Sequence, residues 1–343
     1  MRAAVYRGPG DLVVEDVAEP VGPAGDELRI EVSKAAICGT DASEWLHGPV
    51  LARPPVILGH EFVGRVVETG SAVSSLKPGD RVVSGAGASC GSCRWCLSGR
   101  TNLCQRYYTL GLHVNGGLAE QVVAPASTCF RVPDEVSDTA AAMVQPLAVA
   151  LHAVRRAGLV QGDSCVVIGA GGIGAFVVAA AASRGADPLV VVDVDEERLD
   201  VARKLGATEL VDARSARVVE VIEAVTSDQG ADVVIEATGS PGSPAVALGA
   251  ARKGGVVVIV GLQPEPLPVD LLSLTTREID VRGTLAHVCD VDVPESIAIV
   301  AGTSIADVVL DREIDLGDLV EEGIRPLAER RAKGKIIVGV ARG

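Results

Sequence analysis

Aromatic residues are scarce in this chain of 343 residues, where Phe, Trp and Tyr together make up 2% of the positions. Hydrophobic residues still make up 48%, so the core must be built mainly from Val, Ala, Leu and Ile. A chain of this length is too long for one typical domain, and we therefore expect two domains.

Basic residues are also fewer than acidic ones. Lys and Arg total 31 against 45 Asp and Glu, which gives a net charge of −14, and no basic cluster offsets this average. An acidic surface repels phosphate backbones and anionic lipid headgroups. Nucleic-acid and membrane partners are therefore disfavoured.

Long hydrophobic runs are missing as well. The most apolar helix-like stretch, Ile173 to Ala182, is far too short to span a bilayer. The first residues, Met1 to Tyr6, read as a strand and lack the apolar run of a signal peptide. We therefore expect a cytoplasmic protein.

The cysteines do not resemble a disulfide framework. Half of the eight fall in one short segment and an export signal is lacking, so metal binding is the better interpretation. Four thiolates close a tetrahedral zinc site with no open position, which is the arrangement of structural zinc. An iron–sulfur cluster usually has other spacing, and a nucleic-acid-binding zinc ribbon conflicts with the net charge. The pattern is C-x2-C-x2-C-x7-C, formed by Cys90, Cys93, Cys96 and Cys104.

The pattern of apolar runs and turn residues changes near Leu147. Before it, short β-like runs such as Leu28–Val32, Val63–Val67 and Arg81–Ser84 alternate with Gly- and Pro-rich turns, which predicts a β-rich domain with long loops. After it, apolar runs alternate with helical patterns, which predicts a parallel sheet covered by helices on both faces. The predicted strands are residues 165–169, 189–193, 209–212, 233–237 and 256–260, and helices are predicted at 175–184 and 197–205.

The segment after about Asp290 contains a helical pattern and one strand-like run, Ile336–Val340. It is too short to fold alone, so we expect it to return and complete the first domain. The expected division is residues 1–147 for a catalytic domain with both metal sites, 148–290 for a nucleotide-binding domain and 291–343 for the returning segment.

A glycine-rich loop follows the first predicted strand of the second domain. Gly169, Gly171 and Gly174 form G-x-G-x-x-G between that strand and a helix of small residues. The first glycine permits a tight turn, the second lets the backbone approach a pyrophosphate, and the third allows close packing of helix and strand. The helix N-terminus, with Gly172 and Ile173, then offers amide donors to the phosphates. The alternative is a chance glycine turn.

Asp193 ends the next predicted strand, about 20 residues on, where the dinucleotide-binding fingerprint has an acidic residue. Its carboxylate can accept hydrogen bonds from ribose hydroxyls and would repel a 2′-phosphate. NAD is therefore favoured over NADP. Arg198 could partly offset that repulsion, although an arginine there equally fits an exposed helix face.

Cys38, His60 and Glu61 form a looser constellation. Each alone is a weak signal, because a single Cys is more often a core residue and a single His more often a satisfied polar group. Together with a loop for a nicotinamide cofactor, a thiolate, an imidazole and a carboxylate suggest a catalytic zinc that keeps one position open.

These motifs, in this order, resemble the zinc-containing medium-chain dehydrogenase/reductase family, especially its sorbitol and butanediol dehydrogenase branch. The resemblance implies an α/β fold, with a GroES-like β-rich catalytic domain and a Rossmann coenzyme domain, a doubly wound parallel sheet, inserted in its middle. It also implies a homo-oligomer, either a tetramer or a dimer. The residues that carry it are 38–41, 59–61, the four-cysteine segment, 117–120, 145–147 and 169–174.

The resemblance also implies roles for single residues. Cys38 and His60 would bind the catalytic zinc directly, while Glu61 and Gln145 are alternatives for the third ligand, each directly or through water. Thr40 matches the hydroxyl that relays the substrate proton towards the nicotinamide ribose. Further cofactor contacts are expected at Thr238, Val260, Gly261 and Thr284.

Two positions depart from the family pattern. Gln145 stands where the polyol branch commonly has Glu, so the site loses a formal negative charge. Ser43 stands where relatives often have His, so the proton would leave through Ser43, Glu44, His47 or water. His47 equally fits a histidine of a surface loop. The remaining cysteines and histidines are interpreted as structural: Cys129, Cys165, Cys289, His113, His152 and His287.

The predicted function is reversible hydride transfer between NAD and a secondary alcohol, diol, polyol, sugar or cyclitol. Two zinc ions per chain, one catalytic and one structural, would support it. Because of Gln145 and Ser43, the alternative is a catalytically impaired dehydrogenase-like protein that binds NAD. The sequence does not distinguish among these substrates.

Overall fold

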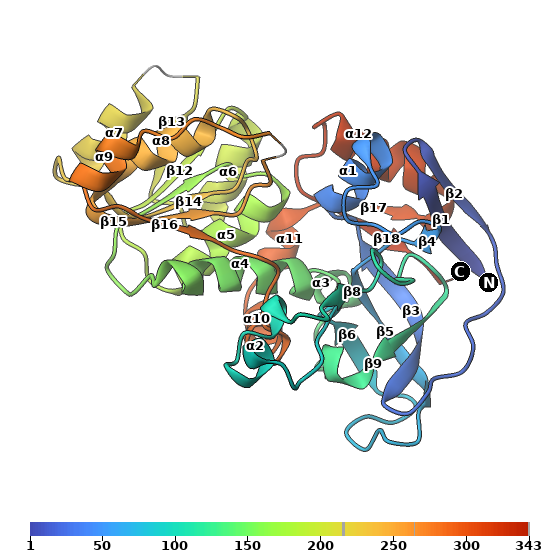
Figure 1. Ribbon diagram of the computed structural model, residues 1–343. Helices are drawn as coiled ribbons and strands as arrows, with labels where there is room; N and C mark the ends of the chain where they lie inside the picture. Colours follow the sequence, from blue (N-terminus) through green and yellow to red (C-terminus); the bar gives the residue numbers. More distant parts are fainter. Residues whose placement is uncertain (215–216, 264, 342–343) are drawn as a thin grey trace. The chain divides into compact units, whose positions relative to one another are not determined.

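The computed structural model describes residues 1–214, 217–263 and 265–341 (Figure 1). The chain divides into two compact units. The first comprises Met1–Ala148 with Val288–Gly343, and the second comprises Val149–His287. The divisions therefore follow residues 148 and 287, against 147 and 290 in the expectation from the sequence.

The first unit is built mainly from strands, and its largest sheet has the order β10-β6-β5-β3-β18-β17, with β9 also paired to β3. Smaller sheets have the orders β2-β1-β4 and β7-β8. The strands are β1 (Arg2–Gly8), β2 (Asp11–Asp16), β3 (Glu27–Ala36), β4 (Val56–Ile57), β5 (Glu61–Thr69), β6 (Arg81–Ser84), β7 (Gly87–Ala88), β8 (Tyr108–Thr109), β9 (Gln121–Pro125), β10 (Cys129–Arg131), β17 (Leu310–Asp315) and β18 (Lys335–Gly339).

Short helices connect these strands. In the N-terminal part they are α1 (Gly39–His47), α2 (Arg94–Leu97), η1 (Thr101–Leu103), η2 (Ala126–Thr128), α3 (Asp138–Ala141) and α4 (Val144–Ala157), which runs on into the second unit. In the C-terminal part they are α10 (Cys289–Gly302), α11 (Ile305–Val309), η3 (Leu316–Asp318), η4 (Leu319–Ile324) and α12 (Arg325–Ala328).

The C-terminal segment adds two strands to the large sheet. β18 pairs antiparallel with β3, Ile337 opposite Ala36, and β3 pairs antiparallel with β5, Ala36 opposite Glu61. Aliphatic side chains dominate the shared core, among them the fully buried Ile30, Ile336 and Val338. The middle of this sheet therefore joins the start of the chain to its end.

The second unit is a six-stranded sheet of order β13-β12-β11-β14-β15-β16, and every neighbouring pair is parallel. This confirms the predicted parallel sheet. Its strands are β11 (Cys165–Ile168), β12 (Leu189–Asp193), β13 (Glu209–Asp212), β14 (Ala231–Glu236), β15 (Ala251–Ile259) and β16 (Asp280–Gly283). Its helices, seen around the sheet in Figure 1, are α5 (Gly172–Ser183), α6 (Glu196–Lys204), α7 (Val218–Val225), α8 (Ser243–Ala250) and α9 (Leu271–Thr276).

Local sequence explains these elements. Apart from Asp193 at the end of β12, β11 and β12 are runs of apolar, mostly β-branched residues. Both strands are buried along their whole length, as central strands of a covered parallel sheet are. α6 begins where the Asp195 carboxylate accepts the backbone amides of Glu197 and Arg198. Acidic residues in its first turn and basic residues in its last turn complement the helix dipole. None of the helices in the described part of the chain combines the length and apolarity needed to cross a membrane.

Candidate active site and metal centres

The glycine loop lies between β11 and α5, as the sequence predicts. Gly169 has a φ of +94°, in the left-handed region that favours glycine. A Cβ on Gly174 would lie 1.9 Å from the Gly169 carbonyl oxygen, and one on Gly169 would lie 2.5 Å from Cγ2 of Thr238. Gly172 faces open space. The loop is thus tight against its own backbone and open at the start of the helix, which suits a pyrophosphate.

Asp193, at the end of β12, is held against this loop. Its Oδ2 accepts the amide of Ala170 at 2.7 Å, and its Oδ1 accepts the amide of Asp195 at 3.0 Å. Each carboxylate oxygen has a second lone pair, so the group can still accept ribose hydroxyls. Arg198 lies close by, since a Cβ on Gly171 would be 3.5 Å from one of its terminal nitrogens.

The remaining predicted cofactor contacts gather at the ends of neighbouring strands. Val260 follows β15 and donates its amide to the Glu236 carbonyl oxygen at 2.8 Å. Gly261 packs so closely that a Cβ there would lie 2.2 Å from the Gly239 nitrogen. Thr284 follows β16 and donates its amide to the Ile259 carbonyl oxygen at 3.3 Å. These residues lie on the carboxyl edge of the sheet, where doubly wound folds bind ligands.

Glu236 organises this edge, and sequence reasoning missed it. It is fully buried, and its Oε1 accepts the amide and hydroxyl of Thr238 at 2.7 and 2.6 Å and the hydroxyl of Ser243 at 2.7 Å. Thr238 in turn packs on Gly169. The available signal was an acidic residue directly after the apolar run Val233–Ile235.

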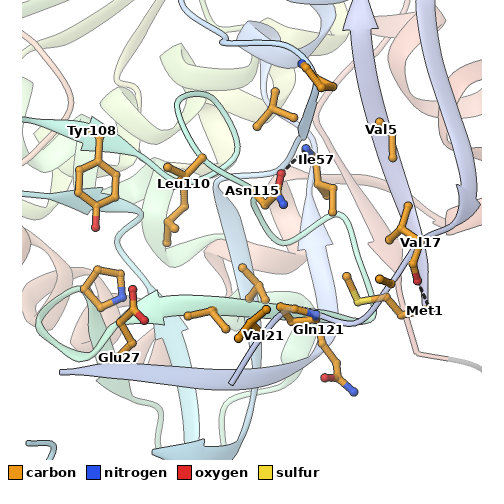
Figure 2. Close-up of a pocket in the computed structure, with 18 residues that line it drawn as sticks. Met1, Val5, Val17, Val21, Glu27, Ile57, Tyr108, Leu110, Asn115 and Gln121 are labelled. Carbon is orange, nitrogen blue, oxygen red and sulfur yellow. Dashed lines mark hydrogen bonds between the residues drawn. The ribbon is translucent and has the colours of Figure 1, made fainter. Parts of the chain in front are cut away.

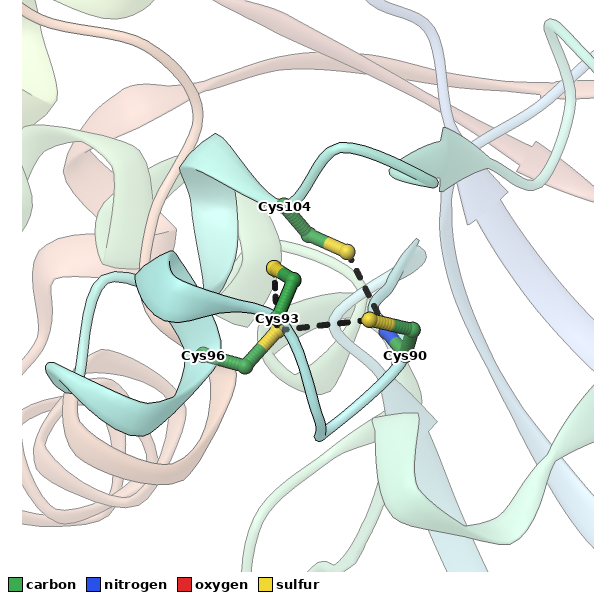
Figure 3. A group of neighbouring side chains, drawn as sticks. All are labelled: Cys90, Cys93, Cys96 and Cys104. Atoms are coloured by element: carbon green, nitrogen blue, oxygen red, sulfur yellow. Dashed lines mark hydrogen bonds between the residues drawn. The ribbon is translucent and has the colours of Figure 1, made fainter.

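The four cysteines of the predicted structural site form one cluster around α2 (Figure 3), with all four sulfur atoms within 4.8 Å of one another. The Cys96 sulfur lies 3.6 Å from that of Cys93 and 4.0 Å from that of Cys90. Zinc–sulfur bonds of about 2.3 Å in a tetrahedron put sulfur atoms roughly 3.8 Å apart. The cluster therefore fits a zinc ion.

The electrostatics of the cluster also suit a cation. Contacts from the backbone and hydroxyl of Ser92 and from Arg106 lower the pKa of Cys90 to about 5, which favours the thiolate that binds metal. Backbone contacts from Cys96 and Gln105 lower the pKa of Cys93 as well. Burial instead raises the pKa of Cys104 to about 11, and its sulfur accepts the amides of Cys90 and Arg106.

A second cluster unites Cys38, His60 and Glu61, whose ligand atoms lie within 4.8 Å of one another. Cys38 is the N-cap of α1, and Glu61 is the first residue of β5. Gly59 precedes His60 with a φ of +97° and lies against the backbone of Leu118. This turn directs the His60–Glu61 pair towards the start of α1.

Two buried residues that sequence reasoning missed surround this second cluster. Asp41, with no exposed surface, accepts the Cys38 amide at 2.9 Å through Oδ2, while its Oδ1 lies 3.7 Å from Nδ1 of His60. Lys335 places its Nζ 2.5 Å from Oε2 of Glu61, and both side chains are buried. Asp41 therefore connects two candidate ligands, and Lys335 neutralises a third.

The acidic groups in and around the Cys38–His60–Glu61 cluster stabilise the protonated forms of nearby basic side chains. Burial alone would lower the pKa of His60, but Asp41, Cys38 and Glu61 outweigh it and raise that pKa to about 10. Burial would likewise lower the pKa of Lys335, but Glu61 and Cys38 raise it. Buried anionic donors that hold nearby cations this strongly suit a divalent metal ion.

The predicted proton-relay residues lie on or next to α1. Thr40 Oγ1 is 3.6 Å from the Cys38 sulfur, so it borders the second cluster. Ser43 and His47 are exposed. Glu44 is buried, and its carboxylate accepts the amides of Val50, Leu51 and Ala52 at 2.8, 2.6 and 3.2 Å. Glu44 thus anchors the loop after α1. Gln145 lies in the first turn of α4 and is buried.

The other cysteines and histidines have packing contacts. Cys129, Cys165 and Cys289 are buried, and burial raises each of their pKa values to about 12. Nδ1 of His113 accepts the Thr109 amide at 3.0 Å. His152 and His287 are buried as well.

A cavity of about 620 Å³ lies elsewhere on the first unit (Figure 2). Apolar side chains such as Val5, Val21 and Leu110 line it, together with Tyr108 and Gln121. The predicted metal ligands and cofactor-binding residues are not among its lining residues. The site is therefore defined by its donor atoms rather than by this cavity.

Comparison with known proteins gives consistent matches over both units. The family model "Alcohol dehydrogenase GroES-like domain" matches residues 24–134, and "Zinc-binding dehydrogenase" matches residues 172–302. The chain is 34% identical to a sorbitol dehydrogenase of Bacillus subtilis (strain 168), over 84% of this chain and 82% of that protein. It is 35% identical to an L-threonine 3-dehydrogenase of Pseudoalteromonas translucida (strain TAC 125), over 75% of this chain and 76% of that protein.

A solved structure agrees with these relatives. The crystal structure of 2R,3R-butanediol dehydrogenase from Bacillus subtilis superposes with a TM-score of 0.91 at 32% identity, and the match covers 99% of each chain. Both the GroES-like and the Rossmann-type parts of the predicted fold are thereby confirmed.

Proposed function

We propose that this chain, which belongs to the zinc-containing medium-chain dehydrogenase/reductase family, oxidises a secondary alcohol reversibly with NAD as the hydride acceptor. The observation that carries the proposal is the gathering of Cys38, His60 and Glu61 in a chain that also has an open glycine loop next to Asp193. A thiolate, an imidazole and a carboxylate form a donor set for zinc that leaves a position for substrate.

The proposed substrate class is a secondary alcohol, diol or polyol. Sorbitol, threonine at its third carbon and 2,3-butanediol, which appear in the names of the relatives, all carry a hydroxyl on a secondary carbon. Sugars and cyclitols share that feature and remain in the class. The comparisons give no support to a catalytically impaired NAD-binding protein.

We propose two zinc ions per chain. Cys90, Cys93, Cys96 and Cys104 would hold the structural ion. Cys38 and His60 would hold the catalytic ion, with Glu61 or Gln145 as the third ligand. When bound, the catalytic zinc supplies Lewis acidity that lowers the pKa of the substrate hydroxyl, and the nicotinamide accepts the hydride.

The chain's own residues prepare this chemistry. Asp41 fixes the Cys38 amide and faces His60, so it would orient both ligands. Thr40, beside Cys38, would relay the proton of the hydroxyl, accepting it while it gives up its own. Exposed Ser43 or His47, or water, would then pass it to solvent. Glu44 would not, because its oxygens hold the amides of residues 50–52.

NAD is proposed over NADP because Asp193 places a carboxylate beside the glycine loop. The cofactor would contact Gly169, Gly171, Gly172, Ile173, Gly174, Asp193, Arg198, Thr238, Val260, Gly261 and Thr284. Arg198 would face the pyrophosphate or the adenosine ribose, since it lies next to Gly171.

A homo-oligomer, dimer or tetramer, is part of the proposal. β16 is an edge strand of the parallel sheet, and Val281 on it is 48% exposed. Leu271 and Leu272 of α9 are 67% and 75% exposed. An unpaired sheet edge and exposed leucines both favour contact with another copy. Light scattering should give at least twice the chain mass, and Val281→Lys should lower it; a monomeric wild type would contradict this.

We also propose that the protein works in the reducing cytoplasm. All eight cysteines are free, and zinc-binding thiolates must stay reduced.

The direct test measures NADH absorbance with a panel of secondary alcohols, diols, polyols, sugars and cyclitols, offered with NAD and with NADP. We expect NADH formation with members of the panel and little NADPH formation. Lack of turnover with every alcohol, in protein that contains both zinc ions, would contradict the proposed function.

A further inference from the structure

A buried lysine from the far end of the chain enters the candidate catalytic metal site. β18 pairs with β3, Ile337 opposite Ala36, and Lys335 is the first residue of β18. Lys335 is 5% exposed and Glu61 is 2% exposed. Nζ of Lys335 lies 2.5 Å from Oε2 of Glu61.

Because of this contact, the Glu61 carboxylate would interact with two cations, the Lys335 ammonium and a bound metal ion. Its carboxylate belongs to the same cluster of ligand atoms as Cys38 and His60, so a metal ion held by those two residues would lie within its reach. The ammonium of Lys335 already occupies one of its oxygens. A buried ammonium is stable only while it keeps a partner, so the lysine resists giving that oxygen up.

We propose that Lys335 is a positioning residue that restrains Glu61 at the catalytic zinc. By holding Oε2, the lysine prevents Glu61 from binding the metal with both oxygens and neutralises the charge that Glu61 brings to it. The zinc is thereby bound less tightly and stays more electron-poor. This inference rests on the proposed function, because it assumes that Cys38 and His60 hold a metal ion.

A simpler role for Lys335 is to neutralise a buried carboxylate so that the first unit folds. Both roles predict that loss of the lysine lowers the stability of the metal-free protein. They differ in what happens when zinc is bound. If Lys335 restrains Glu61, its removal tightens zinc binding and changes the ligand arrangement. If it only supports folding, neither property of the loaded site changes.

The experiment compares the wild type with Lys335→Met, in protein prepared with zinc so that folding does not depend on the metal-free state. Zinc loss from the catalytic site to a competing chelator gives the affinity. We expect Lys335→Met to bind zinc about tenfold more tightly, opposite in sign to the roughly 10–100-fold loss of affinity that usually follows removal of a residue that supports metal ligands. Lys335→Arg, which keeps the charge, should match the wild type.

A matched control removes another lysine of the same sheet. Lys34 forms an ion pair with Glu313 at 2.5 Å on a partly exposed part of the first unit. Lys34→Met should leave the zinc affinity of the catalytic site unchanged. An equal change in both methionine variants would show a general charge effect and overturn the proposal.

Cobalt spectroscopy separates restraint of Glu61 from simple repulsion between lysine and metal. Co²⁺ is placed in the catalytic site while zinc stays in the four-cysteine site. Lys335→Met should change the visible absorption of Co²⁺ when Glu61 is present. In a Glu61→Gln background the same substitution should leave the spectrum unchanged. Superimposable spectra of wild type and Lys335→Met, or unchanged or weaker zinc binding, would overturn the inference.

The outcome also distinguishes this inference from the proposed function. A wild type that holds only the four-cysteine zinc and forms no NADH contradicts both. A wild type with two zinc ions and dehydrogenase activity, whose Lys335→Met variant matches it in affinity and spectrum, contradicts the inference alone.

Discussion

At the scale of single residues, the proposed hydride transfer depends on carboxylates that each contact two other groups. Asp193 accepts one amide from the glycine loop and one from the start of α6, and Asp41 connects Cys38 with His60. Such residues fix the orientation of the groups that would contact cofactor or metal. Substitutions here should change function more than stability.

Asp193→Ser should weaken NAD binding and relax the discrimination against NADP, because the carboxylate is both an acceptor for ribose hydroxyls and a source of repulsion for a 2′-phosphate. We expect the ratio of kcat/KM for NAD to that for NADP to fall at least roughly tenfold, which corresponds to about 1.4 kcal/mol. Steady-state kinetics with both cofactors measures it. Unchanged selectivity would remove Asp193 from the cofactor site.

Gln145→Glu should keep both zinc ions but raise the pKa that governs turnover, because an added negative charge near the metal disfavours the deprotonated substrate. The pH–rate profile should therefore shift to higher pH. Gln145→Ala should lower zinc occupancy or turnover. Wild-type profiles and zinc content in both variants would place Gln145 outside the site.

The sequence predicted candidate site residues only where a local motif contains them. The glycine loop, the four-cysteine lobe and His60–Glu61 are recognisable because spacing along the chain reflects their chemistry. Lys335 meets Glu61 only through the pairing of β18, β3 and β5, and no local spacing reports that register. Glu236 is a different case, because its partners Thr238 and Ser243 are close in sequence but belong to no recognisable motif.

At the scale of elements, strands with continuous apolar runs were predicted closely. The predicted strands at residues 189–193 and 209–212 coincide with β12 and β13. β15 was predicted to begin at residue 256 but begins at Ala251. Its first residues include the exposed Lys253 and Gly254, so they lack the hydrophobic pattern of a buried strand.

The four-cysteine segment, Cys90 to Cys104, should stabilise the first unit when zinc is bound. It contains only the short helices α2 and η1, so bound zinc would supply much of its folding free energy. Cys93→Ser should remove one zinc ion and lower Tm by several degrees, since about 1 kcal/mol corresponds to roughly 2–4 °C in a domain of this size. Metal analysis and calorimetry measure both.

Cys289→Ala is the matched control for the lobe. Cys289 is a buried thiol outside the cluster and donates to the Gly87 carbonyl oxygen at 3.3 Å. This variant should lose some stability while keeping two zinc ions. If Cys93→Ser kept the same zinc content and Tm as the wild type, the structural zinc assignment would be wrong.

At the scale of the whole molecule, the candidate metal ligands and the candidate cofactor-binding residues belong to different units. The candidate metal ligands lie in the first unit, and the glycine loop with Asp193 lies in the second. The C-terminal segment returns to the first unit and contributes Lys335. This division could be anticipated from the change of texture along the sequence.

The most direct test of zinc-dependent alcohol oxidation is a titration of NADH formation against zinc content. A chelator removes the zinc of the Cys38–His60 site while the four-cysteine site keeps its own. We expect activity to fall in proportion to the loss of about one zinc ion per chain, with the fold retained, and to return when zinc is restored. Dehydrogenase activity that survives the removal of that ion would contradict the account.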